Sequence, residues 1–127
     1  MADALAERRA EQDRLVAVAR EFARGLAERM PLLAAALVGS VARGDFNVWS
    51  DIDVVVVAQA LPERAIEREG LLLERAPVGV QPVGFTPAEF YRALAKGDRL
   101  AREAVTRGVP LVSAPFFAQR RHLASGV

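Results

Sequence analysis

Apolar residues recur at helical spacing along the first part of the chain and then give way to short apolar runs. Over residues 3–30, apolar side chains return every three or four positions between charged ones, which predicts an amphipathic helix. Pro31 ends this pattern, because proline disfavours a helical conformation at the preceding residue. Residues 32–38 are continuously apolar and predict a first strand, which stops at Gly39.

A second apolar run, over residues 51–58, predicts the central strand of the fold. Beyond Asp51 it is rich in valine and is broken only by Asp53, which is typical of a strand buried on both faces. Side chains two residues apart in a strand point to the same side, so Asp51 and Asp53 project together from its beginning. Two carboxylates this close repel each other, and a divalent cation between them would remove the repulsion.

Helices and strands alternate through the rest of the chain. A helix is predicted over residues 62–75, with Pro62 in its first turn, and a strand over residues 78–85. Pro82 within that strand indicates a sheet edge or a bulge. The remaining predicted elements are a helix after the Thr86 cap with Glu89 three residues later, a helix from the Asp98 cap to Arg107, a strand over 109–112 and a tail over 114–127 with no clear pattern.

This alternation predicts a single α/β or α+β domain over residues 1–127, with its core at about 33–112. The absence of cysteine excludes disulfides, thiolate metal sites and cysteine nucleophiles, and the single histidine, His122, argues against histidine-based zinc sites and catalytic triads. A net charge of +1 predicts no direct DNA binding. With no signal peptide and no membrane-spanning run, we expect no membrane partner and a cytoplasmic location.

The two strands carry the candidate chemistry at neighbouring ends. Gly39-Ser40 follows the first strand, and ten residues separate this pair from Asp51. A glycine lets a backbone approach a ligand closely, and the Ser40 hydroxyl and N–H suit a phosphate oxygen, with Arg43 one helical turn further on. Together with Asp51 and Asp53, these residues predict a site for a metal–triphosphate complex.

The pattern of Gly-Ser, ten residues and Asp-x-Asp resembles the signature of the polymerase-beta-like nucleotidyltransferase superfamily. The segment 39–45, Gly-Ser-Val-Ala-Arg-Gly-Asp, is similar to that of its minimal nucleotidyltransferases, small proteins often encoded beside a HEPN-domain partner. The resemblance implies a small mixed sheet with helices packed on one side of it. It also implies that Asp51 and Asp53 are catalytic ligands of one or two Mg²⁺ ions and that Gly39, Ser40 and Arg43 bind the nucleotide.

The reaction implied by the resemblance is transfer of a nucleoside monophosphate, AMP from ATP, to a hydroxyl of a partner protein. The HEPN-linked subset further implies an antitoxin that modifies a HEPN toxin within a homo- or hetero-oligomer. The second hypothesis is a binding protein rather than an enzyme: a catalytically weak module that binds nucleotide or protein and neutralises a HEPN partner by contact. A third is transfer to a small molecule such as an aminoglycoside, for which the chain has no evident second domain to build an acceptor pocket.

The chain departs from the family pattern at one position. Active members usually carry a third carboxylate on the next strand, but residues 78–85 contain no acid, and Gln81 is the best candidate for the equivalent position. An amide offers a carbonyl oxygen but neither charge nor a proton acceptor comparable to a carboxylate. Glu74 and Glu89 flank this strand and are predicted to be a solvated side chain and a capping residue, respectively.

Aromatic residues near the site and in the tail have simpler interpretations. Phe46, Val48 and Trp49 are predicted to pack and shape the loop before Asp51, with stacking of Trp49 on a base as the alternative. Phe116 and Phe117 either cover the core or form a patch for a partner.

Overall fold

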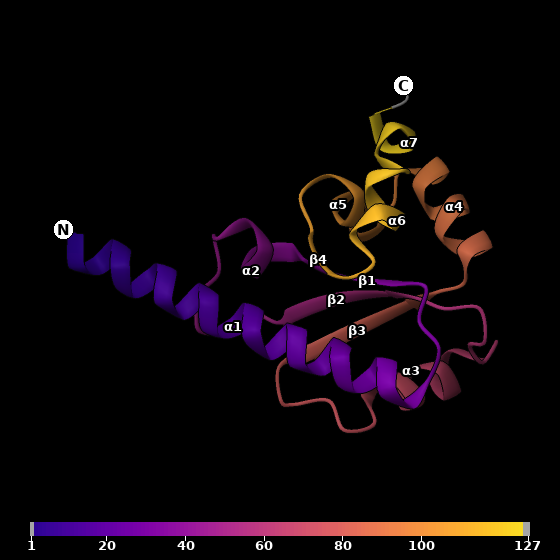
Figure 1. Ribbon diagram of the computed structural model, residues 1–127, viewed down its shortest axis with the longest axis horizontal. Coiled ribbons are helices and arrows are strands. Elements are labelled where there is room, and N and C mark those ends of the chain that lie inside the picture. Colours follow the sequence, from indigo (N-terminus) through magenta and orange to yellow (C-terminus); the bar gives the residue numbers. More distant parts are fainter. Residues whose placement is uncertain (1, 126–127) are drawn as a thin grey trace.

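A four-stranded mixed sheet forms the centre of the computed structural model, which describes residues 2–125 (Figure 1). The elements in chain order are α1 (Ala2–Arg29), β1 (Ala34–Val38), α2 (Gly39–Arg43), β2 (Ile52–Val57), α3 (Ala65–Leu73), β3 (Val80–Phe85), α4 (Pro87–Lys96), α5 (Arg99–Thr106), β4 (Val109–Val112), α6 (Ala114–Ala118) and α7 (Arg121–Ser125). The strand order is β3-β2-β1-β4; β2 and β3 are parallel and the other pairs antiparallel. The predicted α/β class with a mixed sheet is confirmed. Positions 1, 126 and 127 of the predicted domain and tail lie outside the described residues.

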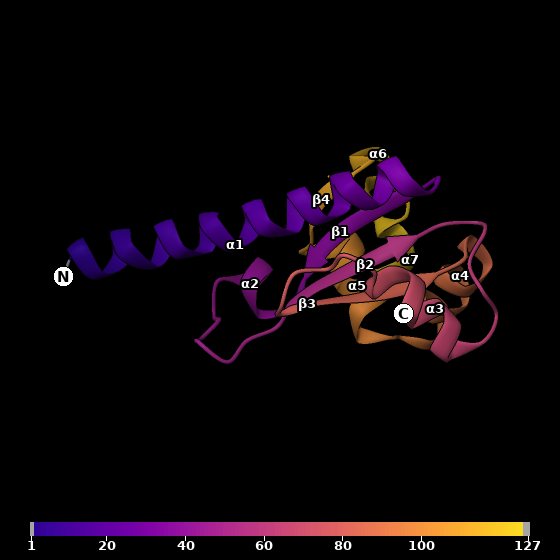
Figure 2. The same ribbon diagram turned by 90° about the horizontal axis from the view of Figure 1, so that it is seen from below.

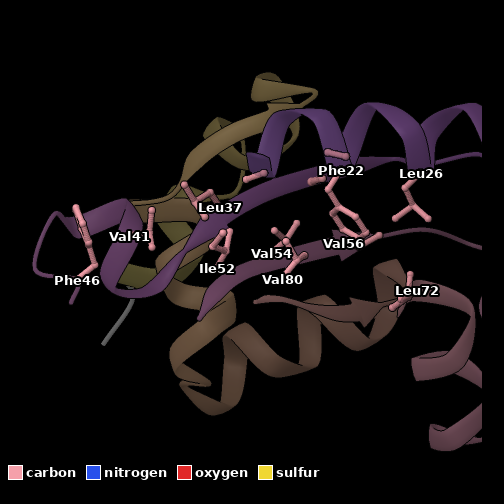
Figure 3. Close-up of a cluster of buried hydrophobic side chains, with 13 residues drawn as sticks. Phe22, Leu26, Leu37, Val41, Phe46, Ile52, Val54, Val56, Leu72 and Val80 are labelled. Atoms are coloured by element: carbon pink, nitrogen blue, oxygen red, sulfur yellow. The ribbon is translucent and has the colours of Figure 1, made fainter. Parts of the chain in front are cut away.

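Helices cover both faces of the sheet, so the expectation that they pack on one side is wrong (Figure 2). On one face α1, α2 and α3 enclose a cluster that includes Phe22, Leu26 and Val54 (Figure 3). On the other face α4 to α7 enclose a cluster centred on Phe90. The central strands require this arrangement, because their side chains are apolar on both sides.

The side chains of β2 show most directly why both faces of the sheet are covered. Val54 and Val56 point into the cluster beneath α1, whereas Val55 and Val57 point into the cluster beneath α4 and α5, and all four are fully buried. Burying a valine side chain contributes roughly 1.5 kcal/mol or more. The valine run therefore places the beginning of β2, and the acidic residues there, on a rigid support.

The edge position of β3 was correctly predicted from Pro82. β3 pairs with β2 and lies at one end of the strand order, so the missing N–H of Pro82 costs no sheet hydrogen bond. The predicted start of the following helix is also confirmed. Thr86 and Glu89 form a capping box, in which the Thr86 hydroxyl accepts from the Glu89 N–H and the Glu89 carboxylate accepts from the Thr86 N–H.

Several predicted boundaries were wrong, including the start of the third strand, which is Val80 rather than residue 78. The helix expected over residues 62–75 begins only at Ala65, because the backbone of the preceding residue, Arg64, is extended. The Pro62 carbonyl accepts a hydrogen bond from the Arg68 Nε at 2.8 Å. The first strand begins at Ala34 rather than at residue 32.

The tail is two short helices, α6 and α7, rather than an irregular segment. Phe117 is buried, and Phe116 packs against the same cluster as Phe90. The alternative in which these rings cover the core is therefore the one observed.

The N-terminal half of α1 extends past the sheet and reaches the loop between α2 and β2 (Figures 1 and 2). The Arg8 guanidinium donates to the carbonyls of Gly44 and Phe46 and stacks on the Phe46 ring, 4.4 Å from its centroid. The Gln12 side chain donates to the Val41 carbonyl at 2.8 Å. These contacts hold the loop that links the two candidate site segments.

Over residues 2–125, the structure contains no helix of the length and hydrophobicity that a membrane span needs.

Candidate active site

Pairing of β1 with β2 brings Gly39 against Asp53. The strands are antiparallel with Val38 opposite Asp53, so the residue that follows β1 lies beside the beginning of β2. A Cβ atom on Gly39 would lie 2.5 Å from Asp53 Oδ2, and the φ angle of Gly39 is +77°, a conformation that favours glycine. Gly39 therefore leaves space for the Asp53 carboxylate, whereas its predicted close approach to a ligand stays a prediction.

Asp51 and Asp53 stand at the beginning of β2, as the alternation of the strand predicts. Asp53 is half-buried within the strand, and Asp51 is exposed just before it. Burial raises the pKa of the Asp53 carboxyl, the charge of Asp51 raises it further, and the guanidinium of Arg99 opposes both effects. The charged form of Asp53 is therefore held in an unfavourable environment that a bound cation would improve.

Gln81 lies beside Asp53 on the neighbouring strand. The parallel pairing of β2 with β3 places these two residues opposite each other, so both side chains leave the same face of the sheet from strands about 4.8 Å apart. No residue of β3 is acidic. Glu89 is engaged in its capping box and with Arg68 at 2.7 Å, and Glu74 lies 3.9 Å from Arg29, consistent with the capping and solvated roles predicted for them.

Ser40 and Arg43 both belong to α2, the single helical turn that leaves β1. This turn begins at Gly39 and ends at Gly44, whose φ angle is +89°. Ser40 is half-buried in its first turn. The Arg43 side chain forms an ion pair with Asp45 at 3.2 Å and a second with Glu103 at 2.8 Å.

Glu103 is the residue of this site that sequence reasoning missed. It lies on α5, where only 12% of its side chain is exposed. Its carboxylate accepts hydrogen bonds from the Gly39 N–H at 3.1 Å and from Arg99 at 3.0 Å in addition to Arg43. The spacing of Arg99 and Glu103 indicates a helical ion pair, but the contacts with Gly39 and Arg43 span 60 residues or more and leave no local signal.

Comparison with known proteins identifies the family. A family model described as "Nucleotidyltransferase domain" matches residues 19–103, about two thirds of the chain. The chain belongs to the nucleotidyltransferase family. The match spans Gly39, Ser40, Asp51 and Asp53, and it makes nucleotidyl transfer the activity class of this enzyme.

The fold of this nucleotidyltransferase also matches a solved structure. A crystal structure from Sulfolobus solfataricus, named "putative nucleotidyltransferase", superposes with a TM-score of 0.62. The two sequences are 24% identical, and the match covers 81% of this chain and 84% of the other. At this identity the likeness supports the fold. A search of curated proteins found no match to this sequence.

The residues of the nucleotidyltransferase site suit a divalent cation that also binds its substrate. Across residues 2–125, no cluster of three or more His, Cys, Asp or Glu side chains is arranged to hold a metal ion. Asp53 within β2 and Asp51 just before it nevertheless supply two hard oxygen ligands, and the charge of Asp51 is near enough to raise the pKa of Asp53. Mg²⁺ is commonly held by one or two carboxylates with substrate phosphates completing the shell. The donor set therefore fits a cation that arrives with a triphosphate.

The loop before Asp51 differs from its prediction. Phe46 is buried and packs as expected, but Val48 and Trp49 are 90% and 88% exposed. The Asn47 side chain accepts the Trp49 N–H at 2.8 Å, which holds the exposed turn. Packing is therefore not the role of Trp49 in this nucleotidyltransferase, and its stacking on a base stays a prediction.

Proposed function

We propose that this nucleotidyltransferase transfers AMP from ATP to a hydroxyl group of a partner protein in a Mg²⁺-dependent reaction. The partner is a HEPN-domain toxin, for which the chain serves as antitoxin. The observation that supports the nucleotidyl-transfer part is the close approach of Gly39 to the Asp53 carboxylate, with Asp51 near enough for its charge to raise the pKa of Asp53. The partner and the nucleotide rest on the similarity of segment 39–45 to minimal nucleotidyltransferases.

The proposed reaction needs positioning and charge neutralisation more than covalent chemistry by the protein. The acceptor hydroxyl oxygen bonds to the α-phosphorus, the bond from that phosphorus to the bridging oxygen breaks, and pyrophosphate leaves while the hydroxyl proton passes to solvent. Ser40 and Arg43 orient the phosphates, and Asp51 and Asp53 hold the cation. When bound, Mg²⁺ neutralises charge on the attacking and leaving oxygens.

A second candidate function is favoured by the strand next to Asp53. Since β3 carries Gln81 and no carboxylate, the site lacks the third acid usual in active members. A protein of this kind could bind nucleotide and neutralise its HEPN partner by contact. The two candidates differ in one property: contact inhibition survives loss of the carboxylates, whereas nucleotidyl transfer does not.

A labelling experiment tests the proposal. Purified protein, Mg²⁺ and ATP labelled in its adenine are incubated in a lysate of the host, beside an Asp51→Asn/Asp53→Asn double variant and an Asp13→Asn control. Asp13 is an exposed residue of α1, so this control changes a carboxylate away from the site. We expect a labelled protein band with the wild type and the control only. Absence of any band, with Mg²⁺-dependent ATP binding by the wild type, would support the binding module instead.

Restoring an acid beside Asp53 should raise turnover. Gln81→Glu places a carboxylate next to Asp53, and a positioned general base typically contributes about 10²-fold or more to a rate. The measurement is the initial rate of AMP transfer at fixed ATP and Mg²⁺. Gln59→Glu, an exposed site beyond the other end of β2, controls for added negative charge. Equal rates for both variants would remove Gln81 from the third-acid position.

A further inference from the structure

Donors from two helices, α2 and α5, surround the Glu103 carboxylate. Oε1 accepts from the backbone N–H of Gly39 at 3.1 Å and from Nη1 of Arg43 at 2.8 Å. Oε2 accepts from Nη1 of Arg99 at 3.0 Å. Both carboxylate oxygens are therefore engaged, and they lie at the turn where β1 passes into α2 beside Asp53.

The chemistry of these donors suits a phosphate group as well as a carboxylate. Arginine guanidinium groups and backbone N–H groups are the donors that commonly bind phosphate oxygens, because they combine positive charge with directed hydrogen bonds. A carboxylate offers two oxygens and one negative charge, whereas a triphosphate offers more of both. Glu103 thus makes the contacts that a phosphate group would make at this place.

We infer that the Gly39 N–H, Arg43 and Arg99 form one anion-binding position that Glu103 occupies in the free protein. A phosphate group of the nucleotide takes this position by displacing the Glu103 carboxylate. That the displacing anion is a nucleotide phosphate rests on the proposed function. The existence of the anion-binding position does not depend on nucleotidyl transfer. The chain therefore carries an internal competitor of its own substrate.

Glu103 and a phosphate group compete because both need the same backbone donor. The single N–H of Gly39 points to Glu103 and cannot donate fully to a phosphate oxygen at the same time. Arg43 is similarly shared, since it also pairs with Asp45. A residue that only braced the arginines would leave the Gly39 N–H free for the ligand.

The surroundings of Glu103 can receive both the ligand and the displaced side chain. The residues of an adjoining hollow of about 660 Å³ include Arg43, Arg99, Arg102, Arg107, Thr106 and Glu103. Four arginines against one glutamate make this hollow positive, although the chain as a whole carries a net charge of only +1. Arg107, the residue after α5, lines the same hollow four positions after Glu103, so it offers the carboxylate another partner after displacement.

Removing the charge of Glu103 should strengthen polyphosphate binding. Glu103→Gln keeps the length of the side chain and an oxygen for Gly39, but it no longer neutralises Arg43 and Arg99. Calorimetric titration with inorganic tripolyphosphate, with and without Mg²⁺, is expected to give a Kd about tenfold lower for the variant. Glu28→Gln removes an arginine-paired glutamate elsewhere, on α1, and should leave the Kd within about twofold of the wild type.

An unchanged or higher Kd for Glu103→Gln would overturn the inference, because a brace or a purely structural role predicts that outcome. An equal gain in Glu28→Gln would also overturn it, since the effect would then come from overall charge. Arg99→Gln should raise the Kd by about tenfold if Arg99 belongs to the position.

The wild type provides a test that needs no folded variant. In nitrogen-15 NMR spectra, the Gly39 amide signal should move on addition of Mg²⁺ and tripolyphosphate as its acceptor changes from carboxylate to phosphate. A Gly39 signal that stays in place while the protein binds the anion would contradict the displacement. If the labelling experiment fails but Glu103→Gln lowers the Kd and the Gly39 signal moves, only nucleotidyl transfer is rejected. If labelling succeeds but neither of these effects is seen, only the role of Glu103 as an internal competitor is rejected.

Discussion

Asp53→Asn is expected to abolish nucleotidyl transfer while the protein stays folded. The amide keeps the shape of the side chain but loses the charge that holds a cation and, through it, the triphosphate. Loss of such an electrostatic interaction should lower the transfer rate by at least about 10²-fold. Stability should not fall, because burial and Asp51 already raise the pKa of Asp53 and disfavour its charged form.

Two measurements separate these effects. Transfer rates report the loss of activity, and thermal unfolding with and without Mg²⁺ reports the cation site, since a ligand that binds only the folded state raises the melting temperature. The wild type and the exposed-site control Asp13→Asn should be stabilised by Mg²⁺, whereas Asp53→Asn should not. Full activity in Asp53→Asn would show that the cation is held elsewhere.

Gly39→Ala is expected to damage both stability and activity. An alanine at φ +77° costs about 1–3 kcal/mol, and its Cβ would lie 2.5 Å from Asp53 Oδ2. The carboxylate must then turn away from its position beside Asp51. We expect a lower free energy of unfolding in denaturant together with a transfer rate near that of Asp53→Asn.

Gly25→Ala is the matched control for this substitution. Gly25 lies within α1, and a Cβ atom there would meet no atom within 4 Å. Alanine should stabilise the helix by about 0.5–1 kcal/mol, because glycine is the poorer helix former. A Gly39→Ala protein with wild-type stability and activity would refute the close approach of Gly39 and Asp53.

Several parts of the fold could be predicted because their causes are local. The valine run of β2 indicated a strand buried on both faces, and Pro82 indicated an edge, because proline lacks the N–H that a central strand uses. The Thr86–Glu89 capping box depends on residues three apart and was equally readable. The start of α3 was predicted wrongly from Pro62, because the backbone of Arg64 is extended and the helix begins only after it.

The candidate site also contains residues that the sequence predicted and features that it did not. Gly39, Ser40, Asp51 and Asp53 were recognisable from their spacing and from the strands that precede or contain them. The sequence predicted that Gly39 leaves space for a ligand. In the structure this space is taken by the side chain of Asp53, which lies opposite the end of β1. Neither the exposure of Trp49 nor the side of the sheet covered by each helix could be predicted from the local pattern.

The sequence by itself determined the strand and helix periodicities, the turn at Gly39 and the pair of carboxylates at the beginning of β2, because each depends on residues a few positions apart. Only the tertiary structure decided that Gln81 lies beside Asp53 and that Glu103 meets Gly39 and Arg43. Those contacts join residues 28 to 64 positions apart. Parallel pairing of β2 with β3 places Gln81 beside Asp53, and packing of α5 on the sheet brings Glu103 to Gly39 and Arg43.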